Sequence, residues 1–356
     1  MKMSLRACTS PRIIAVAGSL LLCVSLAHAK LDEAALAKLI PQITTYKAGQ
    51  SRKSLIEAQK IVADAAKEPK DAATAARVLA AVLGSPKATR EAKDFVCRQL
   101  WVIGTAEQVP VLAAMLADEK LAHMARYAME RMACPAVDDA LRQALPKLKG
   151  DLLIGVVSSI GERRDAKAAA ALAKLLGGKD EAVAVAAGSA LGKIGGAESA
   201  AAIGGARAKA SGRLKDVLTE SWLLAAEGLL ASGKKAEATK VYDALSAPSE
   251  PRHVRVAALG GRLKTMVPAD AAKLLIGLVQ GDDAKMRVVA VRRLTGVPGK
   301  EVTATVAALL AKADPTLQSL LIGVLAARGD SAAAQAVAAL ARGSKDAAVR
   351  VAAAQA

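Results

Sequence analysis

Aromatic residues and histidines are scarce in this chain of 356 residues. Aromatic side chains make up 2% of it, and of its three histidines only His123 and His253 lie outside the N-terminal segment. Neither is followed by a second ligand at the helical spacing that metal sites use. The sequence therefore predicts no metal site, no bound cofactor and no catalytic residue, and we expect a protein that is not an enzyme.

Strand signals and phosphate-binding loops are missing as well. Val, Ile and the aromatic residues form no alternating runs, whereas the strong helix formers Ala, Leu, Lys and Glu are abundant. The glycine-rich segment 196–205 contains no Gly-Lys-Ser/Thr sequence. These absences leave the all-α class as the one that fits the composition.

Residues 1–29 have the three parts of a secretory signal peptide. A positive segment precedes the uncharged apolar run 13–26, which is too short to span a membrane comfortably, and small residues follow at the −3 and −1 positions of a cleavage site. The residues concerned are Lys2, Arg6 and Arg12 in the positive segment and Ala27, Ala29 and Lys30 around the cleavage site. We expect export by the general secretory route, a mature chain without a transmembrane span, and a periplasmic or secreted protein.

Basic residues outnumber acidic ones throughout the mature chain. The formal net charge is +17, and it falls to +14 without the three basic residues of the signal segment. In an exported protein this balance favours an acidic protein, an anionic glycan or lipid headgroups as counterpart, and not nucleic acid. Two cysteines remain, Cys97 and Cys134, at heights of neighbouring helices that differ by about 12 Å. This offset is too large for a disulfide, so we expect free thiols.

Internal repetition is the main organising signal. The segments 254–258 and 349–353, Val-Arg-Val-Ala-Ala in both cases, have related copies along the chain. Nine related helices, about 32 residues apart on average, start at positions 92, 124, 152, 183, 221, 254, 286, 317 and 349. A period in this range without strands predicts an α-solenoid of stacked helical hairpins.

Each repeat has a first helix, a stop at a small residue and a second helix. The second helices are expected at 107–116, 135–145, 166–176, 236–245, 268–279, 299–311 and 331–341. A capping helix over 31–45 and a weaker repeat from Ser54 precede the array. The predicted organisation is a signal peptide at 1–29, a capping helix and degenerate repeat at 30–91, and a repeat array at 92–356 that ends within its last repeat.

The Val-Arg-x-x-Ala and Leu-Gly-x-Ile-Gly patterns resemble the HEAT-like repeats of the phycobilisome-lyase subtype, clearly over 92–356 and loosely over 54–91. The resemblance implies an armadillo-type solenoid in an exported bacterial form. The tetratricopeptide alternative lacks its Trp, Tyr and Pro signature here. Similar repeats occur in di-iron deoxyhypusine hydroxylases, whose His-Glu pairs have no counterpart, since Met124 follows His123 and Val254 follows His253.

The expected function is that of a non-catalytic protein-binding scaffold of the cell envelope, with partners docking along the curved surface lined by the second helices. Two alternatives stay open. The chain is a targeting or interaction module of a longer exported enzyme or cytochrome, whose catalytic domain lies beyond residue 356. Otherwise it is a lyase- or hydroxylase-type enzyme of the HEAT class, for which the motif residues are missing.

One basic residue recurs in each of several second helices. If these residues point into the concave surface, they form a basic row suited to an acidic protein or an anionic glycan. The alternative is coincidence on a Lys- and Arg-rich solvated surface. The basic row consists of Arg142, Lys174, Lys240 and Lys273.

Three other features have two interpretations each. Phe95, Trp101 and Tyr127 fill the core or anchor a partner. The glycine-rich unit 195–212 is a longer surface loop or a hinge. An arginine repeated at one position of the first helix is a structural ladder or a ligand site; its members are Arg255, Arg287 and Arg350.

Overall fold

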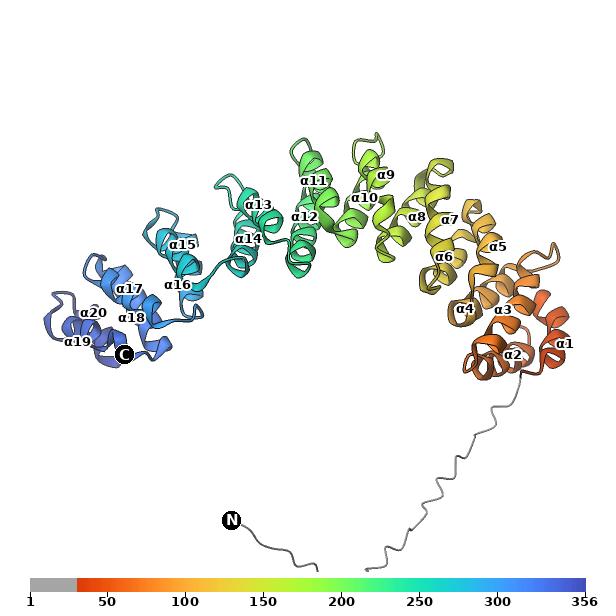
Figure 1. The fold of residues 1–356 in the computed structure, drawn as a ribbon, viewed down its shortest axis with the longest axis horizontal. Coiled ribbons are helices and arrows are strands. Elements are labelled where there is room, and N and C mark those ends of the chain that lie inside the picture. Colours follow the sequence, from red (N-terminus) through yellow and green to blue (C-terminus); the bar gives the residue numbers. More distant parts are fainter. Residues whose placement is uncertain (1–30) are drawn as a thin grey trace, which may run out of the picture.

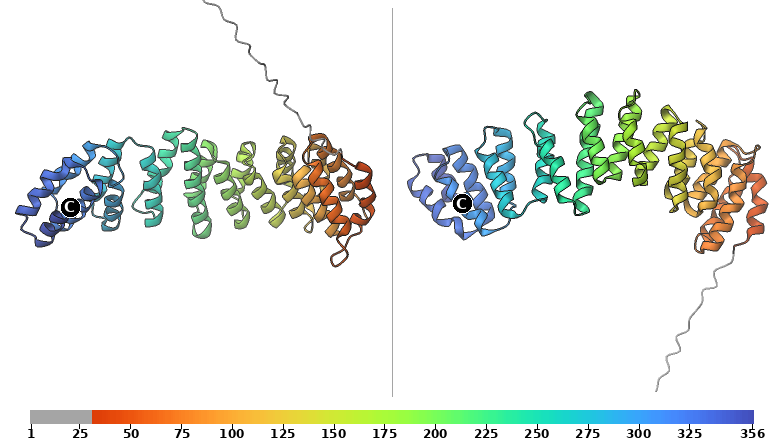
Figure 2. Two further views of the ribbon diagram at one scale, coloured as in Figure 1. Left: turned by 90° about the horizontal axis from the view of Figure 1, so that it is seen from below. Right: turned by 45° about the horizontal axis from the view of Figure 1, so that its top comes forward.

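The computed structural model describes residues 31–356 as an all-α solenoid of twenty α-helices, without a strand in that range. The helices form two rows that follow one arc (Figure 1). Odd-numbered helices line the outer, convex edge and even-numbered helices line the inner, concave edge, most clearly from α9 to α18. The two further views show the helices standing across the long axis, with no part folded back over the ribbon (Figure 2).

The inner row contains the helices that carry the repeat signal. Eight of the nine expected starts are the third residue of an inner helix; the exception, Ser221, lies in the middle of the longest one. The inner helices are α2 (Lys53–Ala65), α4 (Arg90–Ile103), α6 (Ala122–Arg131), α8 (Gly150–Glu162), α10 (Glu181–Ile194), α12 (Gly212–Ala231), α14 (Arg252–Lys264), α16 (Ala284–Leu294), α18 (Pro315–Arg328) and α20 (Ala347–Gln355).

The outer row alternates with the inner one along the chain, and α1 (Glu33–Thr44) packs on α2 and α3 at the first end. Short 3-10 turns extend four of the outer helices, α5, α7, α9 and α19. The outer helices are α3 (Pro69–Leu83), α5 (Val109–Ala114), α7 (Pro135–Ala144), α9 (Ala169–Leu175), α11 (Gly196–Arg207), α13 (Lys235–Leu245), α15 (Pro268–Gln280), α17 (Lys300–Leu310) and α19 (Ala334–Gly343).

Aspartate side chains start many of the inner helices. Asp180, Asp283, Asp314 and Asp346 each accept a hydrogen bond from a backbone N–H group of the first turn. These N–H groups have no partner within the helix, and a carboxylate also interacts favourably with the positive end of the helix dipole. These four aspartates are therefore helix caps, whereas α14 begins after Pro251 without a side-chain cap.

The helices of the last repeats form hairpins with other neighbours than the sequence predicted. Within residues 268–355, each outer helix packs on the inner helix that follows it, α15 on α16, α17 on α18 and α19 on α20, whereas α13 packs on both α12 and α14. The sequence analysis paired each inner helix with the outer helix after it. That pairing was wrong for this part of the chain because the period of a repeat sets the spacing of its units but not where a packed unit begins.

The glycine-rich unit is neither a loop nor an interruption of the core. Residues 196–207 form α11, whose Ile203 is fully buried, so the surface-loop interpretation was wrong. The glycines serve the turns instead, since Gly195 and Gly212 have positive φ angles of 70° and 54°. The buried apolar residues divide elsewhere, inside α14: Ala258 belongs to the cluster that begins at Leu36, and Leu259 belongs to the cluster that ends at Ala353.

Adjacent glycines in α14 show how closely the helices approach. A Cβ atom on Gly261 would lie 2.2 Å from the ring of Tyr242 in α13, whereas one on Gly260 would meet nothing nearer than the Arg293 side chain at 3.5 Å. The missing side chain at Gly261 therefore makes room for the buried Tyr242.

Substitution of these two glycines by alanine should have opposite effects. Gly261→Ala should lower the free energy of unfolding by about 2 kcal/mol, because the ring of Tyr242 has to move within a packed core. Gly260→Ala should be neutral or raise it by up to about 1 kcal/mol, because alanine is the better helix former. Urea denaturation followed by circular dichroism measures both, and equal effects would contradict this packing.

Arginines of the inner row bind the turns between helices. Arg255 pairs with Asp283 of the next repeat, while Arg287 donates to the Gly281 carbonyl at 3.0 Å and Arg350 to the Ser344 carbonyl at 2.8 Å. The structural interpretation of this arginine ladder is thus confirmed, although only the first of the three meets an acidic side chain.

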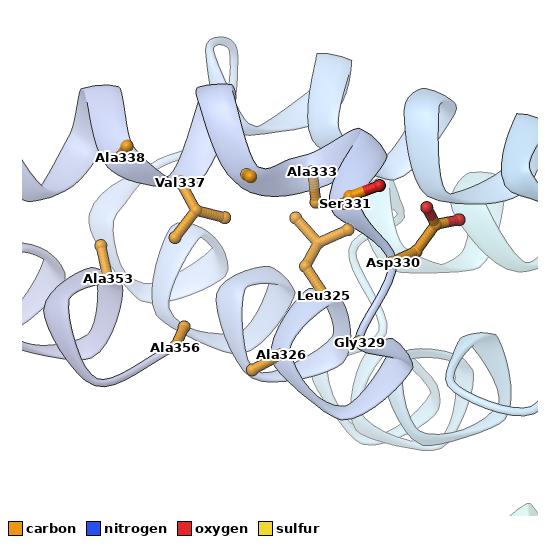
Figure 3. Close-up of a pocket in the computed structure, with 11 residues that line it drawn as sticks. Leu325, Ala326, Gly329, Asp330, Ser331, Ala333, Val337, Ala338, Ala353 and Ala356 are labelled. Atoms are coloured by element: carbon orange, nitrogen blue, oxygen red, sulfur yellow. The ribbon is translucent and has the colours of Figure 1, made fainter.

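The last hairpin borders a groove of about 410 Å³ between α18, α19 and α20 (Figure 3). Leu325 and Val337 extend into it, and alanines line much of the remainder. No side chain of α19 is fully buried, in contrast to α17, which buries six. None of the twenty described helices combines the length and the apolar character that a bilayer crossing requires.

Candidate functional site

Two neighbouring inner helices, α4 and α6, carry a stack of aromatic rings and guanidinium groups. The rings of Trp101 and Tyr127 lie 5.8 Å apart between centroids and 15° from parallel. The guanidinium carbon of Arg131 is 4.7 Å from the centroid of the Trp101 ring, and that of Arg98 is 6.0 Å from the centroid of Tyr127. We call these four residues the aromatic stack.

Helix periodicity explains how the aromatic stack forms. Arg98 and Trp101 are three residues apart on α4, and Tyr127 and Arg131 are four residues apart on α6, so each pair shares a helix face. Packing of α4 on α6 then brings the two faces together. The side of α4 away from the core also exposes Val102, which is 55% accessible.

The third aromatic residue of this region has a different role. Phe95 is buried in the core, whereas Tyr127 is 38% exposed and Trp101 is half-buried. The core-filling interpretation therefore holds for Phe95, whereas the stacked pair is open to solvent and its role as a partner anchor stays a prediction. Arg98 and Arg131 were not predicted from the sequence, although their spacing from Trp101 and Tyr127 could have indicated them.

A buried polar network holds α6 in place beneath the stack. Arg126 donates to the Gly155 carbonyl of α8 at 3.1 Å, and the hydroxyl of Ser159 donates to Glu130 at 2.6 Å. Burial lowers the pKa of Arg126, and the nearby Glu130 carboxylate acts in the opposite direction. A Cβ atom on Gly155 would lie 2.5 Å from the guanidinium carbon, so only glycine leaves space for it.

The two arginines of the stack differ in their other contacts. Arg98 donates to Asp94 at 3.0 Å, and this hydrogen bond raises the pKa of Arg98. Arg131 is exposed and makes no hydrogen bond or ion pair with any residue in 31–356. Its N–H groups are therefore able to receive a carboxylate from another molecule while its plane stays on Trp101.

The aromatic stack suits binding better than chemistry. Large aromatic and arginine side chains contribute most of the energy of many protein interfaces, because they bury much area and lose little side-chain entropy. In the described range, no three His, Cys, Asp or Glu residues are grouped as a metal would require. Cys97 is buried in α4, where burial raises its pKa to about 12, and Cys134 is half-buried; both are free thiols.

The basic row does not line the concave surface. Its helices α7, α9, α13 and α15 lie along the convex edge (Figure 1), because the second helix of each expected repeat belongs to the outer row. Arg142 is 20% exposed and pairs with Asp139 and Asp165, so its charge is used within the fold. Lys174, Lys240 and Lys273 are exposed, and their role in partner binding stays a prediction.

The remaining residues named from the sequence are not brought together. His123 and His253 are both exposed, on α6 and α14. The expected cleavage site at Ala27, Ala29 and Lys30 lies outside the described residues.

The comparisons with known proteins concern fold. No protein-family model matches the chain, and no curated protein sequence matches it. Among solved structures, human deoxyhypusine hydroxylase in complex with glycerol is similar at 19% identity over 70% of this chain and 94% of that chain, with a TM-score of 0.32. The complex of CpcE and CpcF of phycocyanin lyase from Nostoc sp. PCC7120 is similar at 19% identity over 65% and 92%, with a TM-score of 0.33.

A third similar structure is a triple mutant of Kap121p, at 12% identity and a TM-score of 0.44. The match covers 90% of this chain and 45% of that one, so this chain spans less than half of the length of Kap121p. All three similarities are weak, and the assignment as an all-α solenoid rests on the helices and their packing.

Proposed function

We propose that this chain is a non-catalytic protein-binding scaffold of the cell envelope, and that its partner docks on the concave side at the aromatic stack. The single observation that carries the proposal is the alternation of Arg98, Tyr127, Trp101 and Arg131 on two packed inner helices. The site offers ring faces, one uncommitted guanidinium group and the exposed Val102. It offers no nucleophile and no general base.

The partner chemistry follows from these groups. A carboxylate of the partner would pair with Arg131, and an apolar side chain would cover Val102 and the edge of Trp101. An acidic protein fits this combination, in keeping with the positive charge of the mature sequence. The location in the periplasm or outside the cell depends on the signal-peptide pattern of residues 1–29.

Removal of the two rings should abolish capture of the partner. With the mature chain immobilised, the double variant Trp101→Ala and Tyr127→Ala should retain the proteins captured from an envelope extract at least about tenfold less well than the wild type. Quantitative mass spectrometry measures the retention, and circular dichroism checks the helical content.

The matched control is Leu224→Ala, which shortens another exposed apolar side chain of the inner row, 45% accessible on α12. It should leave the captured set unchanged. If the ring variant and the control capture the same proteins in the same amounts, the aromatic stack is not the docking site and the proposed function fails.

A further inference from the structure

A trough crosses one edge of the solenoid between α14 and α17. Its inner half, about 460 Å³, lies between the ends of α14 and α16 and is bordered by Lys264, Arg292 and Arg293. Its outer half, about 510 Å³, lies between the starts of α15 and α17 and is lined mainly by apolar groups. The halves meet at Pro268 and Pro298, which line both. We call the whole feature the edge trough.

The edge trough lies next to the point where the apolar core divides. Ala258 and Leu259, consecutive residues of α14, belong to different core clusters. Arg293 of α16 reaches toward α14, so that its guanidinium would be 3.5 Å from a Cβ atom on Gly260. Space that a tightly packed pair of inner helices would fill is therefore left as a groove between them.

Hydrogen bonds from a neighbouring helix hold one wall of the edge trough in place. Arg328 of α18 donates to the carbonyl of Leu294 at 2.9 Å and to that of Gly299 at 2.8 Å, and it also binds the Val297 carbonyl. On the other side, the hydroxyl of Thr265 at the end of α14 donates to the Arg262 carbonyl at 2.7 Å. A ligand would meet a preformed site, which lowers the entropy cost of binding.

Four cations line the edge trough, and one of them, Lys273, lies 3.9 Å from Asp270. The other three lack the partners that other arginines of the same helices have. The side chains of Lys264, Arg292 and Arg293 make no hydrogen bond or ion pair within residues 31–356. By contrast, Arg255 and Arg262 of α14 pair with Asp283 and Asp243. Positive charge near a helix C-terminus is favourable in itself, which explains their position but not the apolar half beside them.

The apolar half contains the most exposed large hydrophobic side chain among the described residues. Val267 is 61% accessible and lies in the turn between α14 and α15, beside Pro268. Val302 of α17 lines the opposite side, and Glu301 is the one acidic residue among the lining groups of the two halves. An apolar floor joined to three unpaired cations is complementary to an apolar group joined to acidic groups.

We propose that the edge trough binds an extended segment of a partner protein that carries an apolar residue followed by acidic residues. The apolar side chain packs on Val267, Pro268 and Pro298, and the acidic side chains pair with Arg292, Arg293 and Lys264. The trough lies on helices α14 to α17, far along the chain from the aromatic stack on α4 and α6. This second docking site is independent of the proposed function and goes beyond it.

Fluorescence polarisation of the mature chain with a labelled peptide tests the proposal. The probe is Leu-Leu-Ser-Asp-Asp-Glu-Asp, and a peptide with Lys in place of each acidic residue is its counterpart. The acidic probe should bind saturably and more weakly as salt is added, and the basic peptide should not bind. Arg292→Gln with Arg293→Gln should weaken binding by about tenfold or more. Val267→Ser should weaken it by about threefold.

Two controls separate this site from general attraction by a basic protein. Lys174→Gln with Lys240→Gln removes the same charge from exposed positions on outer helices and should leave the affinity within about twofold of the wild type. The double variant Trp101→Ala and Tyr127→Ala, which lacks the two rings, should also leave the affinity for the acidic peptide unchanged. The proposal is overturned by equal weakening in the Lys174 and Lys240 variant, by dependence on the rings, or by the absence of saturable binding to the wild type.

Discussion

Leu191→Asp is expected to lower the free energy of unfolding by at least about 4 kcal/mol. Leu191 is fully buried in α10, which packs on both α8 and α12 in the inner row. The substitution removes an apolar side chain from the core and places a carboxylate where no cation or donor is provided. Chemical denaturation followed by circular dichroism should show the loss as a lower midpoint.

The matched control places the same residue in the same helix. Ala182 is exposed in the first turn of α10, where the helix dipole favours negative charge. Ala182→Asp should therefore change the free energy of unfolding by less than about 0.5 kcal/mol. A Leu191→Asp variant as stable as this control would show that α10 is rotated relative to the core.

Arg163→Met is expected to lower the free energy of unfolding by about 3–5 kcal/mol. Arg163 ends α8 and is 10% exposed in its side chain. It pairs with Asp138 and donates to four carbonyls that end α6 and begin the next turn, those of Met129, Glu130, Met132 and Cys134. Methionine fills similar volume without donating, so a half-buried carboxylate and several carbonyls lose their partner.

The adjacent arginine supplies the control. Arg164 is exposed and makes no hydrogen bond through its side chain within the described residues. Arg164→Gln should change the free energy of unfolding by less than about 0.5 kcal/mol. Equal losses from Arg163→Met and Arg164→Gln would mean that removal of charge, and not of the bonds to the turn, is what destabilises the protein.

Arg163 and Arg328 were missed by the sequence analysis for a physical reason. Both end an inner helix and bind carbonyls around the end of the previous inner helix, at the Met132 and Val297 turns respectively. Arg255, Arg287 and Arg350 could be identified because they recur at one repeat position. Backbone carbonyls leave no trace in a sequence, so a residue that recognises them can be found only when the turns are placed in space.

The two candidate sites differ in how far the sequence could predict them. Trp101 and Tyr127 were recognised as neighbours, since adjacent repeats place them on adjacent helices. The edge trough was not predicted from the sequence. Its lining comes from four helices and from turns, and the close approach of these turns depends on how α14 and α16 pack.

The sequence by itself determined the all-α solenoid and the positions of most inner helices. The repeated Asp caps, Val-Arg segments and glycine stops are local signals, and local propensity and capping decide where a helix starts and ends. Only the tertiary structure decided which helices pair, which row is concave, and where the core divides. These features depend on side-chain packing between units, and a period of about 32 residues is the same for either phase of pairing. For that reason the sequence could not show that Arg142 forms an internal ion pair. Nor could it show that Arg292 and Arg293, which have no repeat signal, border the edge trough.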